Sequence, residues 1–330
     1  MRRRRAATAF AAVVIAVLPA AGAVAQGGPA IPGLPAKTIQ IIVPNVPGGG
    51  PDILARLMTP KLTESLRQNV VVDNRPSVNG VVATEFVARA APDGTVIGMG
   101  NSGTHAVNAT LYKKLSYDPV RDFAAVSELV TTSLVLVASP RLPVNSVKDL
   151  IAAAKKAPGR INVGIAAATG EIATNALKLQ AGIEMNNIPY KGGAQATVAV
   201  MSDEAQLVIT NYALVATQAQ AGKLKILGIT SGKRSSQLPN IPTIAESGGL
   251  DGYAIDQWYG VFLPAKTPQP IVQALARELV RIINLPDVKE KLTSTGHDLV
   301  GSTPEQFTEK VKREVEMYRR IILESKMQQE

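Results

Sequence analysis

The stretch IQIIVPNVPGGGPDILARLM, residues Ile39 to Met58, decides the fold of this chain. It reads as an apolar strand over Ile39–Val43, a loop over Pro44–Pro51 and a helix that begins at Asp52. Three consecutive glycines leave the loop without side chains, so that other atoms can approach the backbone closely where the helix begins. Because the N–H groups of a helix's first turn and the positive end of its dipole suit an anion, the stretch predicts a place for a small negatively charged group.

A second interpretation of this stretch needs no ligand. Many α/β domains begin with a strand, a glycine loop and a helix, and Pro51 and Asp52 suit the first turn of any helix. Asp52 would then only cap its helix. The stretch by itself leaves both interpretations open.

The pattern of the opening stretch returns in the middle of the chain. After it, strands expected over 69–76 and Thr95–Met99 enclose a helix, an order that favours a parallel, doubly wound sheet. From Ile161 a second unit begins, with a strand over Ile161–Ile165, a loop of small residues over Ala166–Glu171 and a helix from about Ile172. The chain therefore has two similar halves, each with a strand, a small loop and a helix.

The third strand runs into a polar segment, GMGNSGTHAVN, over 98–108. Its glycines match G-x-G-x-x-G formally, but a dinucleotide fingerprint follows the first strand of a sheet and this segment follows the third. Ser102 lacks the glycine two residues later that a nucleophile elbow needs, since Thr104 stands there. The segment is better interpreted as a second polar loop at the carboxyl end of the sheet, where ligands bind in open α/β folds.

The last third of the chain returns to the first half. The segment Ile255–Pro268 holds the only tryptophan and has the pattern of a strand rejoining the first sheet, and two helices that follow it are expected to pack there. These crossings predict two lobes with a cleft between them, into which helix N-termini converge from both walls. We expect the first lobe to comprise 37–132 and 254–330, and the second 133–253.

The first 25 residues have the pattern of a signal peptide. Four arginines, Arg2 to Arg5, precede an apolar run, and Ala23-Val24-Ala25 predicts cleavage after Ala25, followed by a disordered lead over 26–36. An uncleaved anchor is the alternative, and the export route, Sec or twin-arginine, stays open. Removal of this segment lowers the net charge from +9 to +5, and no basic patch with interleaved aromatics remains that would favour nucleic-acid binding.

The chain offers little reactive chemistry. It has two histidines and no cysteine, so a zinc site of the ordinary kind is hard to build, and no metal or cofactor is expected. No Walker lysine follows Gly50. His105 can reach the cleft from the polar loop, and a triad with Asp52 stays open although no elbow supports it, whereas His297 is expected to be exposed. A binding protein fits this composition better than an enzyme does.

Six stretches together resemble one family. They are IIVPNVPGGGPDILARLM, VVVDNRP, NSGTHAVNATLYKKLSYDPVRDF, NIPYKGG, AGKLKILGITSGKRSSQLPNIPTIAESG and WYGVFLPAKTP, in order from about Ala36 to the C-terminus. The chain is similar to the extracytoplasmic solute receptors of tripartite tricarboxylate transporters, the Bug-type receptors. The resemblance implies a type II periplasmic-binding-protein fold, a monomer without enzymatic activity in the periplasm, and a permease partner. Its implied ligands are small organic acids or amino acids.

The resemblance also implies where the ligand binds. In the family, the loop after the first strand and its counterpart in the second lobe hold the ligand, largely through backbone groups and bridging waters. Carried over by position, these loops are Pro44–Asp52 and Ala166–Glu171, with Asn101–His105 and Asn211 as neighbours. The residues expected at the ligand are Asn45, Val46, Gly49, Gly50, Pro51, Asp52, Ser102, Gly103, His105, Ala167, Ala168, Thr169, Gly170, Glu171 and Asn211.

This chain departs from the family pattern in both loops. A hydroxyl residue is usual where Pro51 stands and an apolar one where Asn45 stands, and Glu171 follows Thr169 where the family has uncharged donors. Glu171 is either a favourable charge in the first turn of its helix or a group that repels a second carboxylate and selects an amino group.

We expect a periplasmic receptor that captures a small carboxylate by lobe closure and delivers it to a permease. Two alternatives are a receptor that serves a signalling protein and a secreted hydrolase that uses Ser102 or Thr169 with His105.

Overall fold

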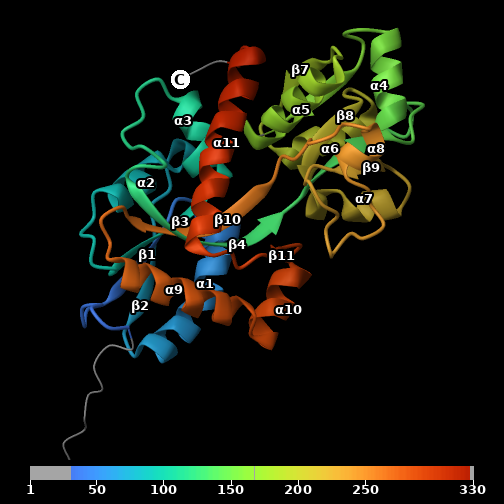
Figure 1. Cartoon of the computed structure of the whole chain (residues 1–330). Coiled ribbons are helices and arrows are strands. Elements are labelled where there is room, and N and C mark those ends of the chain that lie inside the picture. The colour runs from blue at the N-terminus through green and yellow to red at the C-terminus, as the bar shows by residue number, and fades with distance from the viewer. Residues whose placement is uncertain (1–30, 167, 328–330) are drawn as a thin grey trace, which may run out of the picture.

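The computed structural model describes residues 31–166 and 168–327, so the expected signal peptide lies outside the described residues. Two α/β lobes stand side by side, each around its own sheet (Figure 1). Within the lead that was expected to be disordered, Ile31 and Leu34 are buried in the core of the first lobe.

The first lobe is built on a six-stranded sheet in the order β11-β4-β10-β3-β1-β2. β1, β2 and β3 are parallel, as the opening pattern predicted, while β10 inserts antiparallel between β3 and β4. The strands are β1 (Ile39–Val43), β2 (Val70–Asn74), β3 (Val96–Asn101), β4 (Phe123–Thr132), β10 (Gln257–Pro264) and β11 (Asp298–Leu299).

Helices cover both faces of this sheet (Figure 1). Several begin where proline occupies the first turn, which needs no N–H there, and Thr303 caps the last helix with a reciprocal bond from Gln306. The elements are α1 (Gly50–Leu66), η1 (Val78–Gly80), α2 (Val81–Ala88), the π-helical turn η2 (Gly103–Val107), α3 (Asn108–Leu111), α9 (Gln269–Ile283), α10 (Pro286–Ser294) and α11 (Pro304–Glu324).

The second lobe has a five-stranded sheet in the order β7-β6-β8-β5-β9. Its strands are β5 (Leu134–Ala138), β6 (Asn162–Ile165), β7 (Asn186–Pro189), β8 (Leu207–Asn211) and β9 (Lys225–Ile229). Its helices are α4 (Val147–Lys156), α5 (Ala168–Ala181), α6 (Gly193–Ser202), η3 (Tyr212–Leu214), α7 (Ala216–Gln220) and α8 (Ile244–Gly248). The chain passes from the first sheet to the second at Ser133 and returns before Gln257, so two crossings connect the lobes.

The sequence did not predict β4. Its apolar run is broken by Ser127 and Glu128, which are nevertheless buried. Partners from the C-terminal part of the chain satisfy them: the Ser127 hydroxyl donates to the carbonyl of Ser302, 175 residues away, and Lys310 Nζ lies 2.6 Å from Glu128 Oε1. A strand that depends on such distant partners leaves no local pattern.

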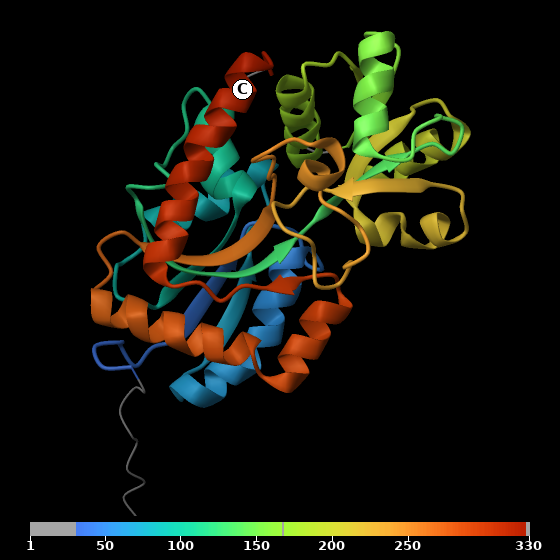
Figure 2. The same ribbon diagram turned by 45° about the vertical axis from the view of Figure 1, so that its right-hand side comes forward.

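Helix α11 connects the two lobes, whereas the sequence indicated that it packs on the first. Its N-terminal half, with Phe307 and Val311, packs on the first lobe. Its C-terminal half, with Tyr318 and Ile322, belongs instead to a core that includes Ile172 of α5. In both views the end of α11 approaches α5 (Figures 1 and 2).

A group of buried charges lies where α11 meets the crossing segments. Lys310 is 3.8 Å from carboxylate oxygens of both Asp256 and Glu314, and Trp258 Nε1 donates to Glu314 Oε2 at 2.6 Å. Burial raises the pKa of Glu314 to about 7, although Lys310 and Trp258 oppose this shift.

We expect Glu314→Gln to flatten the pH dependence of stability. Because the pKa of Glu314 in the folded protein is about 7, against an ordinary value of 4.5, protonation favours folding. This contribution is complete at pH values below the unfolded pKa and is lost as the pH rises through the folded pKa. Relative to the variant, the unmodified protein should lose on the order of 1–3 kcal/mol of unfolding free energy between about pH 5 and pH 8. Urea denaturation of both proteins at both pH values measures this difference in unfolding free energy.

Glu316→Gln is the matched control, since Glu316 lies on the same helix with a side chain that is 71% exposed. This variant should follow the unmodified protein at both pH values. If Glu314→Gln also shows the pH dependence of the unmodified protein, Glu314 is not the cause of that dependence.

Candidate functional site

Asp52 organises the loop after β1 from inside. Its carboxylate accepts from the Gly48 N–H at 2.8 Å, from Arg56 Nε at 3.0 Å and from Asn74 Nδ2 at 2.9 Å. Asn74 Nδ2 also lies 3.1 Å from the Asn45 carbonyl, which ties both ends of the loop together. Burial alone would raise the pKa of Asp52, but these hydrogen bonds outweigh burial and hold its pKa below the usual value. Asp52 is only 2% exposed, so it shapes the loop rather than facing outward.

Helix α1 begins at Gly50, two residues earlier than expected, and Gly50 is required by packing. A Cβ added there would lie 2.5 Å from the hydroxyl oxygen of Tyr259, a buried residue of β10. Val46 at the loop tip is 61% exposed. The loop therefore presents backbone and one valine outward while its charged group stays inside.

The polar segment after β3 lies against this loop. The Asn101 side chain accepts from the Thr104 N–H, and the Thr104 hydroxyl lies 3.0 Å from the Asn101 N–H nitrogen. A Cβ added to Gly80 would touch both Pro44 and Thr104, at 2.8 Å each. Pairing of β1 with β3 and this contact bring Pro44–Asp52 and Asn101–His105 together, as the sequence predicted.

His105 lies in the core of the first lobe. It is 2% exposed, its ring stacks on Phe262 with centroids 3.7 Å apart, and its Nδ1 lies 2.9 Å from the Thr104 hydroxyl. Burial lowers the pKa of His105 to about 3, so the ring is neutral. Ser102 is fully buried as well. Among the hydrogen bonds of residues 31–166 and 168–327, none joins His105 to Ser102 or Asp52, so these residues do not form a triad.

The expectation that His297 is exposed was wrong. Its exposure is 8%, its Nδ1 lies 3.0 Å from the Thr295 hydroxyl, and its ring lies 5.7 Å from that of Tyr259. Burial lowers its pKa. The segment around His297 is rich in polar residues, which suggested an exposed connector. In the structure these residues form a turn that directs the His297 side chain inward, and the sequence alone does not show that direction.

The wall of the second lobe is the start of α5. This helix begins at Ala168, four residues earlier than expected, so Thr169, Gly170 and Glu171 lie in its first turn. A Cβ added to Gly170 would lie 2.9 Å from the carbonyl oxygen of Ile209, so the helix sits directly on β8. Asn211, at the end of β8, is exposed beside it, and Ala167 lies outside the described residues.

Glu171 lies where a negative charge stabilises a helix. It is half-buried in the first turn of α5, where the helix dipole favours a carboxylate. Burial lowers the pKa of Lys178, and the charges of Glu171 and Glu184 act against that shift.

One apolar core connects the two walls. Ala106 and Val107 of η2, Ile172 and Ala173 of α5, and Tyr318 of α11 belong to the same cluster. We call the loops after β1 and β3 the first wall of the candidate site and the starts of α5 and η3 its second wall; helix α11 packs against both η2 and α5. Sequence reasoning missed Arg56, Asn74 and Tyr259, since nothing in their local pattern distinguishes side chains that support a loop.

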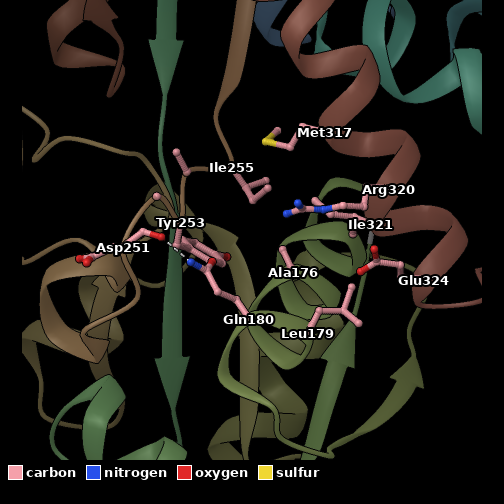
Figure 3. Close-up of a pocket in the computed structure, with 12 residues that line it drawn as sticks. Ala176, Leu179, Gln180, Asp251, Tyr253, Ile255, Met317, Arg320, Ile321 and Glu324 are labelled. Atoms are coloured by element: carbon pink, nitrogen blue, oxygen red, sulfur yellow. Dashed lines mark hydrogen bonds between the residues drawn. The ribbon is translucent and has the colours of Figure 1, made fainter.

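A separate groove of about 390 Å³ lies outside these walls. It is bounded by the second half of α5, the return segment 251–255 and the end of α11, and Gln180 Nε2 donates to the Asp251 carbonyl at its rim (Figure 3). Because α5 begins at the site and this groove lines its other end, the groove is not part of the candidate site.

Two further observations concern metal ligands and membrane spans among the described residues. In ranges 31–166 and 168–327, no set of three or more His, Cys, Asp or Glu side chains is placed to hold a metal ion. Within the same ranges, no helix has the length and apolar character needed to cross a membrane.

Comparison with known proteins gives consistent matches. The chain matches the family model described as tripartite tricarboxylate transporter family receptor over residues 54–327. It is 32% identical over 294 residues to protein BugT of Bordetella pertussis, across 88% of this chain and 90% of BugT. The solved structure of R. palustris Rpa4515 with adipate is 31% identical, with a TM-score of 0.72 and coverage of 88% and 98%. MatC from Rhodopseudomonas palustris with bound malate is 27% identical, with a TM-score of 0.69 and coverage of 87% and 99%.

We expect Asp52→Ala to destabilise the protein by about 2 kcal/mol, because it removes a buried acceptor from the Gly48 N–H, Arg56 and Asn74. Since the folded pKa of Asp52 is lowered, its contribution is present above the unfolded pKa and is lost as the pH falls through the folded pKa. Urea denaturation at neutral and acidic pH measures both effects.

Asp73→Ala provides the control. Asp73 pairs with Arg75 at 2.9 Å on the surface, and its side chain is 37% exposed, so its loss should cost less than about 1 kcal/mol. Equal losses in the two variants would contradict the role assigned to Asp52.

Proposed function

The chain belongs to the tripartite tricarboxylate transporter receptor family, and we propose that it captures a small organic carboxylate in the periplasm and delivers it to the permease of such a transporter. The lobes would close on the ligand, which shifts the equilibrium toward the closed state through its contacts with both walls. This proposal includes export through the segment 1–25 and action as a monomer.

The paired helix starts are the observation that carries this proposal. Helices α1 and α5 begin at Gly50 and Ala168, each directly after a loop that follows a parallel strand. N–H groups in the first turn of a helix have no partner within it and favour an anion. Because Asp52 points into its own loop, its charge does not occupy the outer surface of the first wall.

Similar proteins support a carboxylate as the ligand class. Rpa4515 is described with adipate and MatC with malate. Both ligands carry two carboxylates, and this chain offers one helix start on each lobe. We place the backbone of Val46–Pro51 and of Ala168–Gly170 at the ligand, with Asn45 and Asn211 beside them. His105 and Ser102 are buried behind the first wall, and the half-buried Gly103 lies between them in the chain.

Binding without turnover is part of the proposal. A hydrolase would need a base, and His105 is buried, neutral and stacked on Phe262. A receptor that serves a signalling protein would bind ligand in the same way, and interaction with the permease rather than with a sensor distinguishes the two.

The experiment that tests this function is a ligand screen on the mature chain. Malate, adipate, monocarboxylates and amino acids are each added, and the melting temperature is measured. We expect at least one carboxylate to raise the melting temperature, because a ligand that binds only the folded state stabilises it. Binding is then confirmed by calorimetry, and unchanged ligand is recovered afterwards. A panel without any shift, or a consumed ligand, would exclude the proposed function.

Glu171→Gln tests the second wall. We propose that Glu171 belongs to its helix rather than to the ligand, so the variant should keep the relative affinities for malate, adipate and a monocarboxylate, with a stability loss below about 1 kcal/mol. Glu184→Gln is the control, since Glu184 also acts on Lys178 but follows the far end of α5. A selective gain in dicarboxylate affinity in Glu171→Gln alone would show that Glu171 faces the ligand.

A further inference from the structure

Besides the two crossings and helix α11, a group of side-chain hydrogen bonds joins the lobes away from the candidate site. Asp298 of β11, in the first lobe, accepts from the Ser235 hydroxyl at 2.6 Å, from the Ser236 N–H at 3.0 Å and from the Ser236 hydroxyl. Both serines lie in the loop after β9, in the second lobe. We call these three hydrogen bonds the Asp298 latch. Hydrogen bonds to a carboxylate are stronger than those between neutral groups.

The order of strands places the latch and the site on opposite sides of the crossing segments. In the first sheet, the crossing strands β4 and β10 lie between β11, which carries the latch, and β3 and β1, which carry the site loops. In the second sheet, the crossing strand β5 lies between β9, which precedes the latch loop, and β8 and β6, which precede the site residues. Both sheets therefore give the same arrangement, and β11 lies beneath the second lobe in both views (Figures 1 and 2).

The crossing segments themselves are held firmly. The Ser133 hydroxyl lies 2.9 Å from that of Ser231, and the Ile255 N–H donates to the Thr230 carbonyl at 2.9 Å. Because these segments are the covalent connections between the two sheets, a rotation of one lobe relative to the other would turn about them, as in hinge closure. Points on opposite sides of a hinge move in opposite directions.

We propose that the Asp298 latch opposes ligand-induced closure and thereby sets the affinity of the receptor. When the walls around Gly50 and Gly170 approach each other, Asp298 and Ser236 move apart, so the latch must lengthen or break. A cavity of about 620 Å³ behind the hinge, lined from both lobes by Lys233, Asp256 and Lys289 among others, widens in the same movement. The latch stabilises the unclosed state, and ligand has to overcome it.

This inference deepens the proposed function, since affinity is affected only if the protein binds by closure. A latch that reduces the closed population reduces the apparent affinity by the same fraction. Removing three hydrogen bonds to one carboxylate is expected to raise the closed population, and therefore the affinity, by roughly tenfold.

The first measurement needs no ligand. The chain contains no cysteine, so Val78→Cys and Val198→Cys introduce two unique spin-label sites on the site side of the hinge. Val78 is 72% exposed in the first lobe and Val198 is 57% exposed on α6 of the second. Pulsed electron–electron double resonance then gives the distribution of distances between the two spin labels. In this background Asp298→Ala, and independently Ser235→Ala with Ser236→Ala, should shift the distribution toward shorter distances.

Asp287→Ala is the matched control. It also removes a carboxylate of the first lobe, in the first turn of α10, but Asp287 pairs with Lys61 of the same lobe at 2.8 Å. This variant should keep the distribution of the parent. The proposed role of the latch is overturned if the distance distributions of Asp298→Ala and of the serine variant equal that of the parent. A shift of both distributions to longer distances overturns it as well.

The second measurement uses adipate and malate as probes in calorimetry. Both latch variants should bind whichever probe binds the parent more tightly by roughly tenfold, and Asp287→Ala should not. Unchanged affinity in both latch variants overturns the role of the latch in binding. If neither probe nor any other acid binds the parent, the proposed function fails, while the label distances still decide whether the latch restrains the lobes.

Discussion

The insertion of β10 antiparallel between β3 and β4 is the constraint on which the rest of the structure depends. It returns the chain from the second lobe, so two crossings hold the lobes together and define a hinge. It also places Tyr259 under Gly50 at the start of α1, and Trp258 beside the Glu314 carboxylate of α11. The hinge, the floor of the first wall and the buried charges therefore depend on a single strand.

Charge is used differently at the two sides of this hinge. On the site side, Asp52 is engaged by the Gly48 N–H and by Arg56, so the outer surface of the loop consists of backbone and of Val46. On the other side, Asp298 is engaged by serines of the opposite lobe. In the function that we propose, the first carboxylate fixes the surface that receives an anion, and the second restrains the movement that encloses it. Both carboxylates already accept hydrogen bonds from the protein, which agrees with the proposal that the ligand is bound through backbone N–H groups.

Several polar residues that the sequence did not predict to be buried lie in the interior, where segments far away in the chain pack against them. Ser127 and Glu128 obtain their partners from Ser302 and Lys310, and His297 turns inward beside Tyr259. His105 was expected to reach the ligand, but its ring stacks on Phe262 in the core of the first lobe. In each case the local sequence shows a polar residue, and only the fold shows which way it points. Ile31 and Leu34 give the apolar counterpart, since their short segment has no periodicity but reaches the core.

The sequence by itself determined the two strand, loop and helix units, the return of the chain to its first sheet, and the family to which the chain belongs. Periodicity, glycine and proline act over a few residues, so they predict that a helix follows each of the two loops wherever the chain goes next. They placed the two helix starts at Asp52 and near Ile172, a few residues after the observed starts at Gly50 and Ala168. Only the tertiary structure decided that α11 joins both lobes, that Asp52 points inward and that Asp298 holds the second lobe from the far side of the hinge. These depend on pairs of residues far apart in the chain, whose approach is fixed by the order of strands in two sheets and leaves no signal in either segment alone.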